Sequence, residues 1–185
     1  RDLHLSIRRQ RQMCIRDSDK KLKDTVLNIS RNKKLPSKRV LKDIDHKVGE
    51  ISAKTINKLI KKTPFEASEI CAIGSHGQTL MHKRQARKTF SLQVGDPFLI
   101  GRETNITTVS NFRQANIKNG GQGAPLTPSF HKEFFKSSHE DRLIINIGGI
   151  SNMTFLPKKG KSFGWDCGPG NCMIDNFIQK NSDKK

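Results

Sequence analysis

The stretch LIINIGGISNMTFL, residues 143–156, decides the fold of the chain. It contains two runs of mostly β-branched and apolar residues, which meet at Gly148-Gly149. A glycine pair between two such runs is typical of a two-residue β-hairpin, because glycine adopts the positive φ angles that these tight turns require. The stretch therefore predicts an antiparallel hairpin whose turn exposes backbone N–H groups.

The residues that follow, FGWDCGPGN (163–171), predict a short strand that ends at Asp166. A helix is expected over 171–180, with Asn171 or Gly170 as its cap. Its inward side should hold Met173, Ile174, Phe177 and Ile178. Asp166 has two interpretations. As an ionised carboxylate in a glycine-lined cleft it can deprotonate water or a sugar hydroxyl, or it only caps the loop backbone.

Upstream of residue 68 the apolar residues recur at helical spacing. Residues 20–30 place Leu22, Val26 and Ile29 on one stripe. A second helix is expected to begin after Ser37 and to end at Thr63-Pro64. The apolar face of this second helix should consist of Ile44, Val48, Ile51, Thr55 and Leu59.

Strands are expected to dominate after residue 68. Three short strands are predicted at 70–73, at 92–95 and from Ile106 onward, and a helix that begins at Pro128 should stack Phe130 on Phe134. We expect the 70–73, 92–95 and 143–156 strands to share one sheet.

Four glycine-containing loops are rich in small polar residues. They are SHGQT (75–79), GGQGAP (120–125), NIGGISN (146–152) and DCGPGN (166–171). Glycine lets a ligand approach the backbone closely and exposes N–H groups that bind anions. None of the four matches the GxxxxGK phosphate loop or the GxGxxG dinucleotide fingerprint.

No pattern of side chains predicts a metal site held by the protein. His76 and His82 have no third ligand nearby, and Cys167 and Cys172 have no second cysteine pair. Asp96 follows a strand and either binds a ligand or stabilises a turn. Arg113 either binds a carboxylate or phosphate, because its planar fork suits both, or forms a surface ion pair.

Composition limits the class of protein. The 185 residues contain no run near the ~18 apolar residues of a membrane span, and no apolar leader with a cleavage site. The four cysteines (Cys14, Cys71, Cys167 and Cys172) are too few for a disulfide scaffold, so a reduced cytoplasmic setting is expected.

The net charge is +18, and residues 1–62 carry 19 basic and 7 acidic side chains. Such a charge suggests nucleic acid as a partner, but this basic half has no aromatic residue for base stacking and no nucleic-acid-binding signature. A lysine-rich, solvated helix face is the preferred interpretation.

The chain contains, in this order, GSHGQTLMH, SLQVGD, NFRQANIKNGGQGAPLTPSFH, LIINIGGISNMTFL and WDCGPGNCMIDNF. This series, within residues 20–181, resembles the anhydro-N-acetylmuramic acid kinases, a family in the acetate kinase, sugar kinase and actin superfamily. The resemblance implies an α/β fold: a ribonuclease-H-like (actin-like ATPase) lobe, incomplete here, with a mixed sheet and flanking helices. Residues 1–18 are expected to be non-native or disordered. Residues 19–142 would form an N-terminal lobe without its first strands, and 143–185 the start of the second half of the kinase core.

The resemblance also implies a reaction. ATP with Mg²⁺ would phosphorylate the 6-hydroxyl of 1,6-anhydro-N-acetylmuramic acid as water opens the anhydro ring, giving N-acetylmuramic acid 6-phosphate in cell-wall recycling. The implied partners are the amino sugar and ATP, with no membrane; a homodimer is compatible with the resemblance, and nucleic acid is not favoured.

The family's motifs assign roles to individual residues. Asp166 matches the catalytic carboxylate of a DTGPGN-like motif and would be the general base for the attacking water. Phosphates would be bound by Asn146, Gly148, Gly149, Asn152, Gly168, Gly170 and Asn171. The sugar would be bound by His76, Gln78, Thr79, Arg113 and Gln122.

The chain also departs from the family's pattern. Asn111 and Asn116 stand where the family usually has Asp, which removes two negative charges near the sugar. The family's first Gly-Thr-Ser phosphate loop and its C-terminal lobe have no counterpart in the sequence. We therefore expect a fragment that does not turn over ATP by itself, and an inactive fragment or a basic nucleic-acid-binding module stays open as the alternative.

Overall fold

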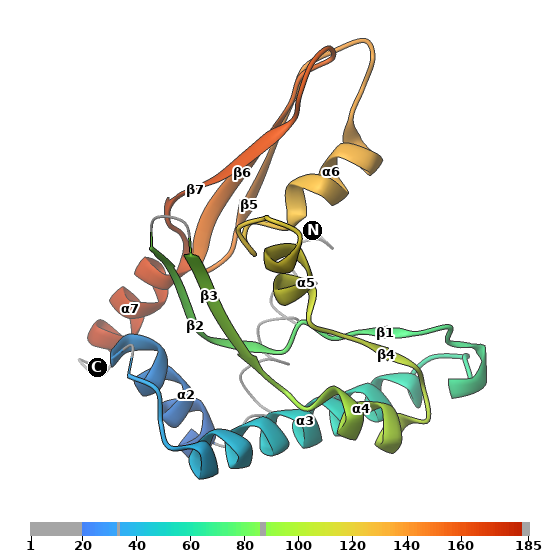
Figure 1. The fold of residues 1–185 in the computed structure, drawn as a ribbon, viewed down its shortest axis with the longest axis vertical. Helices are drawn as coiled ribbons and strands as arrows, with labels where there is room; N and C mark the ends of the chain where they lie inside the picture. Colours follow the sequence, from blue (N-terminus) through green and yellow to red (C-terminus); the bar gives the residue numbers. More distant parts are fainter. Residues whose placement is uncertain (1–19, 33, 86–87, 183–185) are drawn as a thin grey trace. The chain divides into compact units, whose positions relative to one another are not determined.

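A computed structural model describes residues 20–32, 34–85 and 88–182 (Figure 1). The chain divides into two compact units, one ending at Gly121 and the other beginning at Gln122. Both units contain helices and strands, which confirms the prediction of a mixed α/β fold. The segment expected to be non-native, 1–18, lies outside the described residues. In the part of the chain that the structure describes, no helix is long and apolar enough to cross a membrane.

The first unit begins with two helices and continues with short strands. Its elements are α2 (Lys20–Asn32), α3 (Lys38–Ile60), η1 (Ala67–Glu69), β1 (Ile73–Gly74), β2 (Gln78–Gln85), β3 (Lys88–Val94), α4 (Pro97–Thr104), β4 (Thr108–Val109) and α5 (Phe112–Lys118). Helix α3 begins after Ser37 as predicted, and the Ser37 side chain caps it by accepting a hydrogen bond from the Val40 N–H at 3.4 Å.

The core of this unit forms where α2 and α3 meet the β2–β3 hairpin. The predicted stripe of α2 is buried and packs with residues of α3, β2 and β3 in one cluster: Leu22, Val26, Ile29, Ile44, Leu80 and Val94. The predicted apolar face of α3 is wrong at its C-terminal end, because Leu59 is 52% exposed. Helical spacing alone therefore overestimated the buried length of this face.

Strand β2 was not predicted from the sequence. This strand pairs antiparallel with β3, but the register shifts between Thr79 and Met81. The irregularity leaves two successive residues, Leu80 and Met81, both buried. Because a regular strand alternates between buried and exposed residues, this segment lacks the period-two pattern by which strands are recognised.

The prediction that the 70–73, 92–95 and 143–156 strands share one sheet is wrong. The strands belong to three separate sheets, in the orders β1-β4, β2-β3 and β5-β6-β7. The first predicted strand is reduced to β1, which pairs in parallel with β4 in the register Ile73↔Thr108. The second pairs with its neighbour in sequence, since a hairpin satisfies the backbone hydrogen bonds of a strand locally.

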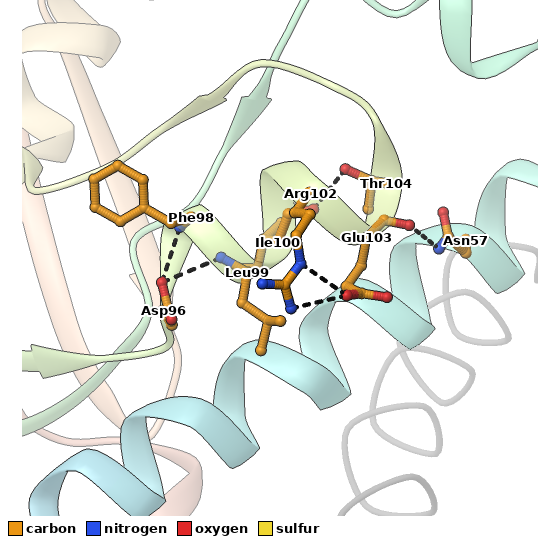
Figure 2. Close-up of polar contacts among 8 residues, drawn as sticks. All are labelled: Asn57, Asp96, Phe98, Leu99, Ile100, Arg102, Glu103 and Thr104. Carbon is orange, nitrogen blue, oxygen red and sulfur yellow. Dashed lines mark hydrogen bonds and ion pairs between the residues drawn. The ribbon is translucent and has the colours of Figure 1, made fainter.

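Helix α4 was also missed, although Asp96-Pro97 marks its start. Figure 2 shows the Asp96 carboxylate accepting hydrogen bonds from the N–H groups of Phe98 (2.9 Å) and Leu99 (3.2 Å). Asp96 is therefore the N-cap of α4, which supports the structural one of its two interpretations. The helix lies on α3, where the Asn57 side chain donates to the Glu103 carbonyl at 2.9 Å.

The second unit is a three-stranded antiparallel sheet with two helices. It comprises α6 (Thr127–Phe135), β5 (Arg142–Ile147), β6 (Ile150–Leu156), β7 (Phe163–Pro169) and α7 (Asn171–Ser182). The predicted hairpin at Gly148-Gly149 is confirmed, but its turn is not of the expected type: neither glycine has a positive φ, and the last pair, Ile147↔Ser151, leaves three residues between its two members. The predicted stacking on α6 is also confirmed, because the Phe130 and Phe134 ring centroids lie 4.4 Å apart. Strand β7 continues past Asp166 to Pro169, so the expectation that a strand ends at Asp166 is wrong.

The two faces of this sheet differ. Helix α6 packs on one face, where the His131 Nδ1 and Thr154 Oγ1 atoms lie 2.9 Å apart and Thr154 is fully buried. The pairing places seven apolar residues on the opposite face: Leu143, Ile145, Ile147, Met153, Phe155, Phe163 and Trp165. Five of these seven are more than 40% exposed: Leu143, Ile145, Ile147, Phe163 and Trp165.

The predicted inward side of α7 is wrong. Its four apolar residues are between 54% and 70% exposed: Met173, Ile174, Phe177 and Ile178. Hydrogen bonds that involve its first residues and Gly170 tie the helix to the β5–β6 turn. Its apolar stripe therefore extends away from the sheet, and the amphipathic spacing correctly predicts a helix but not what packs on it.

The close approach between α3 and the Asp96 turn generates a stability prediction. A Cβ at Gly49 would lie 3.1 Å from the Asp96 N and O atoms, whereas a Cβ at Gly101 in α4 would find its nearest neighbour at 3.5 Å. Alanine favours a helix over glycine by about 1 kcal/mol, and overpacking costs about 1–3 kcal/mol. We expect Gly49→Ala to lower the free energy of unfolding by about 1 kcal/mol and Gly101→Ala to leave it unchanged or raise it. Urea denaturation followed by circular dichroism measures both, and equal stability of the two variants would contradict the packing argument.

Candidate functional site

Three of the residues predicted to act on the nucleotide or the sugar form one row across the sheet of the second unit. Asn146 pairs with Asn152, and Asn152 pairs with Asp166. Side chains directly opposite each other on antiparallel strands share a face and have Cβ atoms about 4.5–5.5 Å apart. The carboxylate and the two amides are therefore neighbours on the face that α6 covers further along the strands. The Asp166 side chain is exposed there.

The row ends at an irregularity in β7. The pairing shifts between Ser151 and Asn152, which face Gly168 and Asp166, so Cys167 is the extra residue of a β-bulge. Gly168 has a φ of +151°, a conformation that disfavours other residues. Bulges occur next to active sites because they change the direction of a side chain relative to the strand. The bulge sets the direction in which the Asp166 carboxylate leaves the sheet.

Hydrogen bonds join the glycine turn of the hairpin to the start of α7. The Gly149 carbonyl accepts from the Gly170 N–H at 2.8 Å, and the Gly148 carbonyl accepts from the Asn171 N–H at 2.7 Å. The Asn171 side chain also donates to the Ile147 carbonyl at 3.0 Å. The two loops that the sequence predicted separately are therefore one structure. Because these N–H groups donate to the hairpin, Gly170 and Asn171 shape the site rather than present their N–H groups to a ligand.

The glycines of this turn differ in how much space surrounds them. A Cβ at Gly170 would lie 2.5 Å from the Gly148 carbonyl oxygen and 2.8 Å from the Ser151 Oγ. A Cβ at Gly149 or at Gly168 would meet no atom within 4 Å. Gly170 is thus required for contact between the two loops, whereas Gly149 and Gly168 border open space that a phosphate group can enter.

The first unit contains a separate pocket of about 400 Å³. It is lined by residues of α3, β3, α4 and three loops: Asp45, Ser75, His76, Gly77, Gln93, Val94, Gly95, Asp96, Pro97, Phe98, Ser110 and Asn111. The Asp45 carboxylate accepts a hydrogen bond from the Gly95 N–H at 2.8 Å, which fixes the turn at one side of the pocket. The Phe98 ring is 88% exposed.

His76 and Arg113 are brought together, although they are far apart in sequence. The Arg113 Nε donates to the His76 Nε2 at 2.8 Å, and the His76 Nδ1 lies 2.9 Å from the Gly77 carbonyl oxygen. Arg113 lies in the first turn of α5 and is half-buried. These two predicted sugar-binding residues therefore form a single unit beside the pocket.

The other three predicted sugar-binding residues are Gln78, Thr79 and Gln122. Thr79 Oγ1 accepts from the Gln93 side chain at 3.5 Å, and Gln78 donates to the Thr79 carbonyl at 3.4 Å. Gln78 is exposed. Gln122 is the first residue of the second unit and is also exposed. Their roles in binding a sugar stay predictions.

The two asparagines that replace the usual aspartates have different surroundings. Asn111 lines the pocket and has a φ of +60°, a left-handed conformation that asparagine and aspartate adopt more readily than most residues. The Asn116 carbonyl accepts from the Gly121 N–H at 2.9 Å, at the end of α5. The backbone conformation at position 111 thus suits both asparagine and aspartate, so it is kept when one replaces the other.

Several residues of the pocket were not predicted from the sequence, among them Asp45 and Phe98. Asp45 follows the buried Ile44 on α3 and looks like one more polar residue on a helix surface. Phe98 lies in a helix that was itself missed. No local pattern distinguishes either residue. Among the described residues, no group of three or more His, Cys, Asp and Glu side chains could hold a metal ion.

Comparison with known proteins identifies similar sequences. A family model described as anhydro-N-acetylmuramic acid kinase matches residues 8–185. A curated protein of that name from Shewanella frigidimarina is 48% identical over 139 residues, which are 75% of this chain and 38% of the relative. Another, from Xylella fastidiosa, is 41% identical over 162 residues, which are 88% of this chain and 42% of the relative. The chain thus spans about two fifths of the length of the curated relatives that it matches.

The contact between Gly170 and the hairpin turn can be tested by a matched pair of variants. Gly170→Ala should lower the free energy of unfolding of the second unit by about 1–3 kcal/mol, because the methyl group would overlap the Gly148 carbonyl. Gly149→Ala should change it by less than about 0.5 kcal/mol, because the added methyl group meets open space. Trp165 is the single tryptophan of the chain, so its fluorescence reports on this unit. A Gly170→Ala variant as stable as Gly149→Ala would contradict the described contact.

Proposed function

Since the chain belongs to the anhydro-N-acetylmuramic acid kinase family, a family of sugar kinases, we propose that it acts in the phosphorylation of an anhydro amino sugar by ATP. The substrates are ATP and 1,6-anhydro-N-acetylmuramic acid, and the product is N-acetylmuramic acid 6-phosphate, an intermediate of peptidoglycan recycling. The observation that carries the proposal is the row Asn146–Asn152–Asp166, which stands next to the glycine turn.

Asp166 is the general base of the proposed reaction. Its carboxylate takes a proton from water as the water oxygen bonds to the anomeric carbon. The bond from that carbon to the bridging oxygen breaks and its electron pair stays on this oxygen, which is now the 6-oxygen of the sugar. The 6-oxygen bonds to the γ-phosphorus of ATP as the bond from that phosphorus to the β–γ bridging oxygen breaks and ADP leaves. The exposed position of Asp166 lets water and a sugar reach the carboxylate. A base of this kind contributes about 10²–10⁴-fold to a rate.

The hairpin turn is the proposed phosphate site. Open space at Gly149 and Gly168 allows phosphate oxygens to come close to the backbone. Asn146 and Asn152 contribute side-chain amides beside them. Mg²⁺ prefers oxygen ligands and usually combines few protein ligands with phosphate oxygens, so the oxygens of this row fit it in type. The ion would neutralise charge on the transferred phosphoryl group.

The pocket of the first unit is the proposed sugar site. His76 and Arg113 border it through their mutual hydrogen bond. The resemblance adds Gln78 and Thr79 of β2 as sugar-binding residues, and Gln122 is the member of this set that lies in the second unit. Arg113 suits the carboxylate that makes the substrate an acid, because the guanidinium fork matches a carboxylate in shape and charge. The polar residues that line the pocket support its assignment as a sugar site.

The proposal extends to architecture and setting. We place the chain in a ribonuclease-H-like fold, with residues 19–142 in one lobe and 143–185 in the start of the second half of the kinase core. A cytoplasmic location follows from a nucleotide substrate and from free Cys71, Cys167 and Cys172. A homodimer is compatible with this scheme.

The comparisons do not favour the two alternatives, an inactive fragment and a nucleic-acid-binding module. The nucleic-acid interpretation depended on the net charge of +18. The described basic residues of α2 and α3 are mainly exposed lysines, such as Lys42, Lys54 and Lys58. Such a surface is typical of a solvated helix face.

The proposal predicts the effect of removing the base. A chimera in which this chain replaces the matched segment of the Shewanella frigidimarina relative should release ADP in the presence of the anhydro sugar. Asp166→Asn in that chimera should lower kcat by about 10²-fold or more, because the amide cannot accept the proton from water. A coupled ADP-release assay measures both.

Glu133→Gln is the matched control, because it removes an exposed carboxylate that forms only a surface ion pair with Lys132 at 3.7 Å. It should leave the rate unchanged. Near-normal turnover by Asp166→Asn would remove Asp166 from the mechanism. An inactive chimera, tested beside an active relative, would contradict the proposed function itself.

A further inference from the structure

We propose that His76 is a positioning residue, held as the neutral Nδ1–H tautomer, which fixes Arg113 through the lone pair of its Nε2 atom. The identity of the ligand that Arg113 receives, the carboxylate of the anhydro sugar, rests on the proposed function. The tautomer and the contact between the two side chains rest on the geometry of the first unit alone.

The two hydrogen bonds of the His76 imidazole can both form in a single protonation state of the ring. A carbonyl oxygen only accepts, so the His76 Nδ1, 2.9 Å from the Gly77 oxygen, must carry a proton. A guanidinium N–H only donates, so the Nε2, 2.8 Å from the Arg113 Nε, must offer a lone pair. In the Nε2–H tautomer, two acceptors would face each other at Gly77 and two donors at Arg113, so neither hydrogen bond could form. In the imidazolium, two donors and two positive charges would meet at Arg113.

The Gly77 carbonyl that selects this tautomer is itself held in place. Gly77 has a φ of +68°, and a Cβ there would lie 2.5 Å from the Val94 carbonyl oxygen. Gly95, on the adjoining turn, also has a positive φ, of +125°, and a Cβ there would lie 3.4 Å from the Gly77 Cα. The two backbone segments thus approach closely at glycines. This packing restricts where the Gly77 carbonyl points and therefore where the imidazole lies.

Arg113 is restrained from the other side by its helix. It occupies the first turn of α5, two residues after the N-cap Asn111, whose left-handed conformation sets the direction in which α5 starts. The contact with His76 uses the Nε–H, which lies on one edge of the guanidinium. Fixing that edge restricts the rotation of the side chain and so sets the plane of the guanidinium.

This arrangement changes the role assigned to His76. With both ring nitrogens engaged, the ring can neither take a proton from a ligand nor coordinate a metal without giving up a partner. A direct hydrogen bond from His76 to the sugar would break the contact with Arg113. His76 therefore acts through Arg113, and the two residues form one anion-recognition unit.

The first test needs no ligand. In ¹⁵N-labelled chain, the His76 ring nitrogens should show the shifts of a protonated Nδ1 and an unprotonated Nε2 at neutral pH. The Arg113 Nε–H should exchange with water at least about tenfold more slowly than that of an exposed arginine such as Arg39. An Nε2–H tautomer, or an Arg113 Nε–H that exchanges as fast as that of Arg39, would overturn the proposal.

Three substitutions separate positioning from a general structural role. His76→Gln places an amide oxygen near the original Nε2 and can still accept from Arg113. His76→Asn places its amide near Nδ1, so it keeps the donor to Gly77 but does not reach Arg113. His76→Ala has neither group. Protection of the Arg113 Nε–H should persist in the Gln variant and be lost in the other two.

Binding of 1,6-anhydro-N-acetylmuramic acid, measured by calorimetry, should follow the same order. We expect Kd to stay within about threefold in His76→Gln and to rise by about tenfold or more in His76→Asn and His76→Ala, which corresponds to the loss of one fixed charged contact. In the chimera, KM should change in this order while kcat stays constant. Equal losses in all three variants, or none, would contradict the positioning role. A further outcome is that the sugar binds neither to the unsubstituted chain nor to any variant, while exchange of the Arg113 Nε–H follows the predicted order. In that case the proposed function fails and the positioning of Arg113 stands.

Discussion

The candidate catalytic region depends on the hydrogen bonds that join the Gly148-Gly149 turn to the start of α7. The carbonyl groups of the turn accept from Gly170 and Asn171, at 2.8 and 2.7 Å. These bonds satisfy the first N–H groups of the helix, which would otherwise have no partner within it. They also hold the segment after Asp166 against the hairpin, so the carboxylate and the turn are parts of one rigid structure. The chemistry proposed for this site requires that they stay together.

The first unit uses close backbone packing for the same purpose. Gly49 lets α3 approach the turn at Asp96, and Gly77 and Gly95 let two loops approach each other. In each place a side chain that borders the pocket is attached to backbone that has little room to move. His76 is the example with a chemical consequence, because the carbonyl next to it determines its tautomer. Position and protonation state are thus set by the backbone rather than by other charged side chains.

How much of this could be predicted from the sequence differs from element to element. Periodicity predicted the buried stripe of α2 and the hairpin, because both patterns are local and regular. It missed β2, where an irregularity buries both Leu80 and Met81, and it missed the short helix after Asp96. The spacing of Phe177 and its neighbours on α7 correctly predicted an amphipathic helix, but not that this side would be exposed. A periodic pattern shows which side of a helix is apolar, and it contains no information about what packs there.

For the candidate site, the sequence could identify residues but not the contacts between them. The Gly-rich strings around Asp166 were recognisable, whereas the row that this carboxylate forms with two asparagines depends on the register of three strands and on one bulge. The contact between His76 and Arg113 joins residues 37 positions apart and has no local signature. Both arrangements are non-local pairings of polar groups, which are set by the geometry of the backbone around them. A likeness between motifs can therefore transfer residue identities from a family to this chain, but the protonation state and orientation that decide what each residue can do must come from its three-dimensional neighbours.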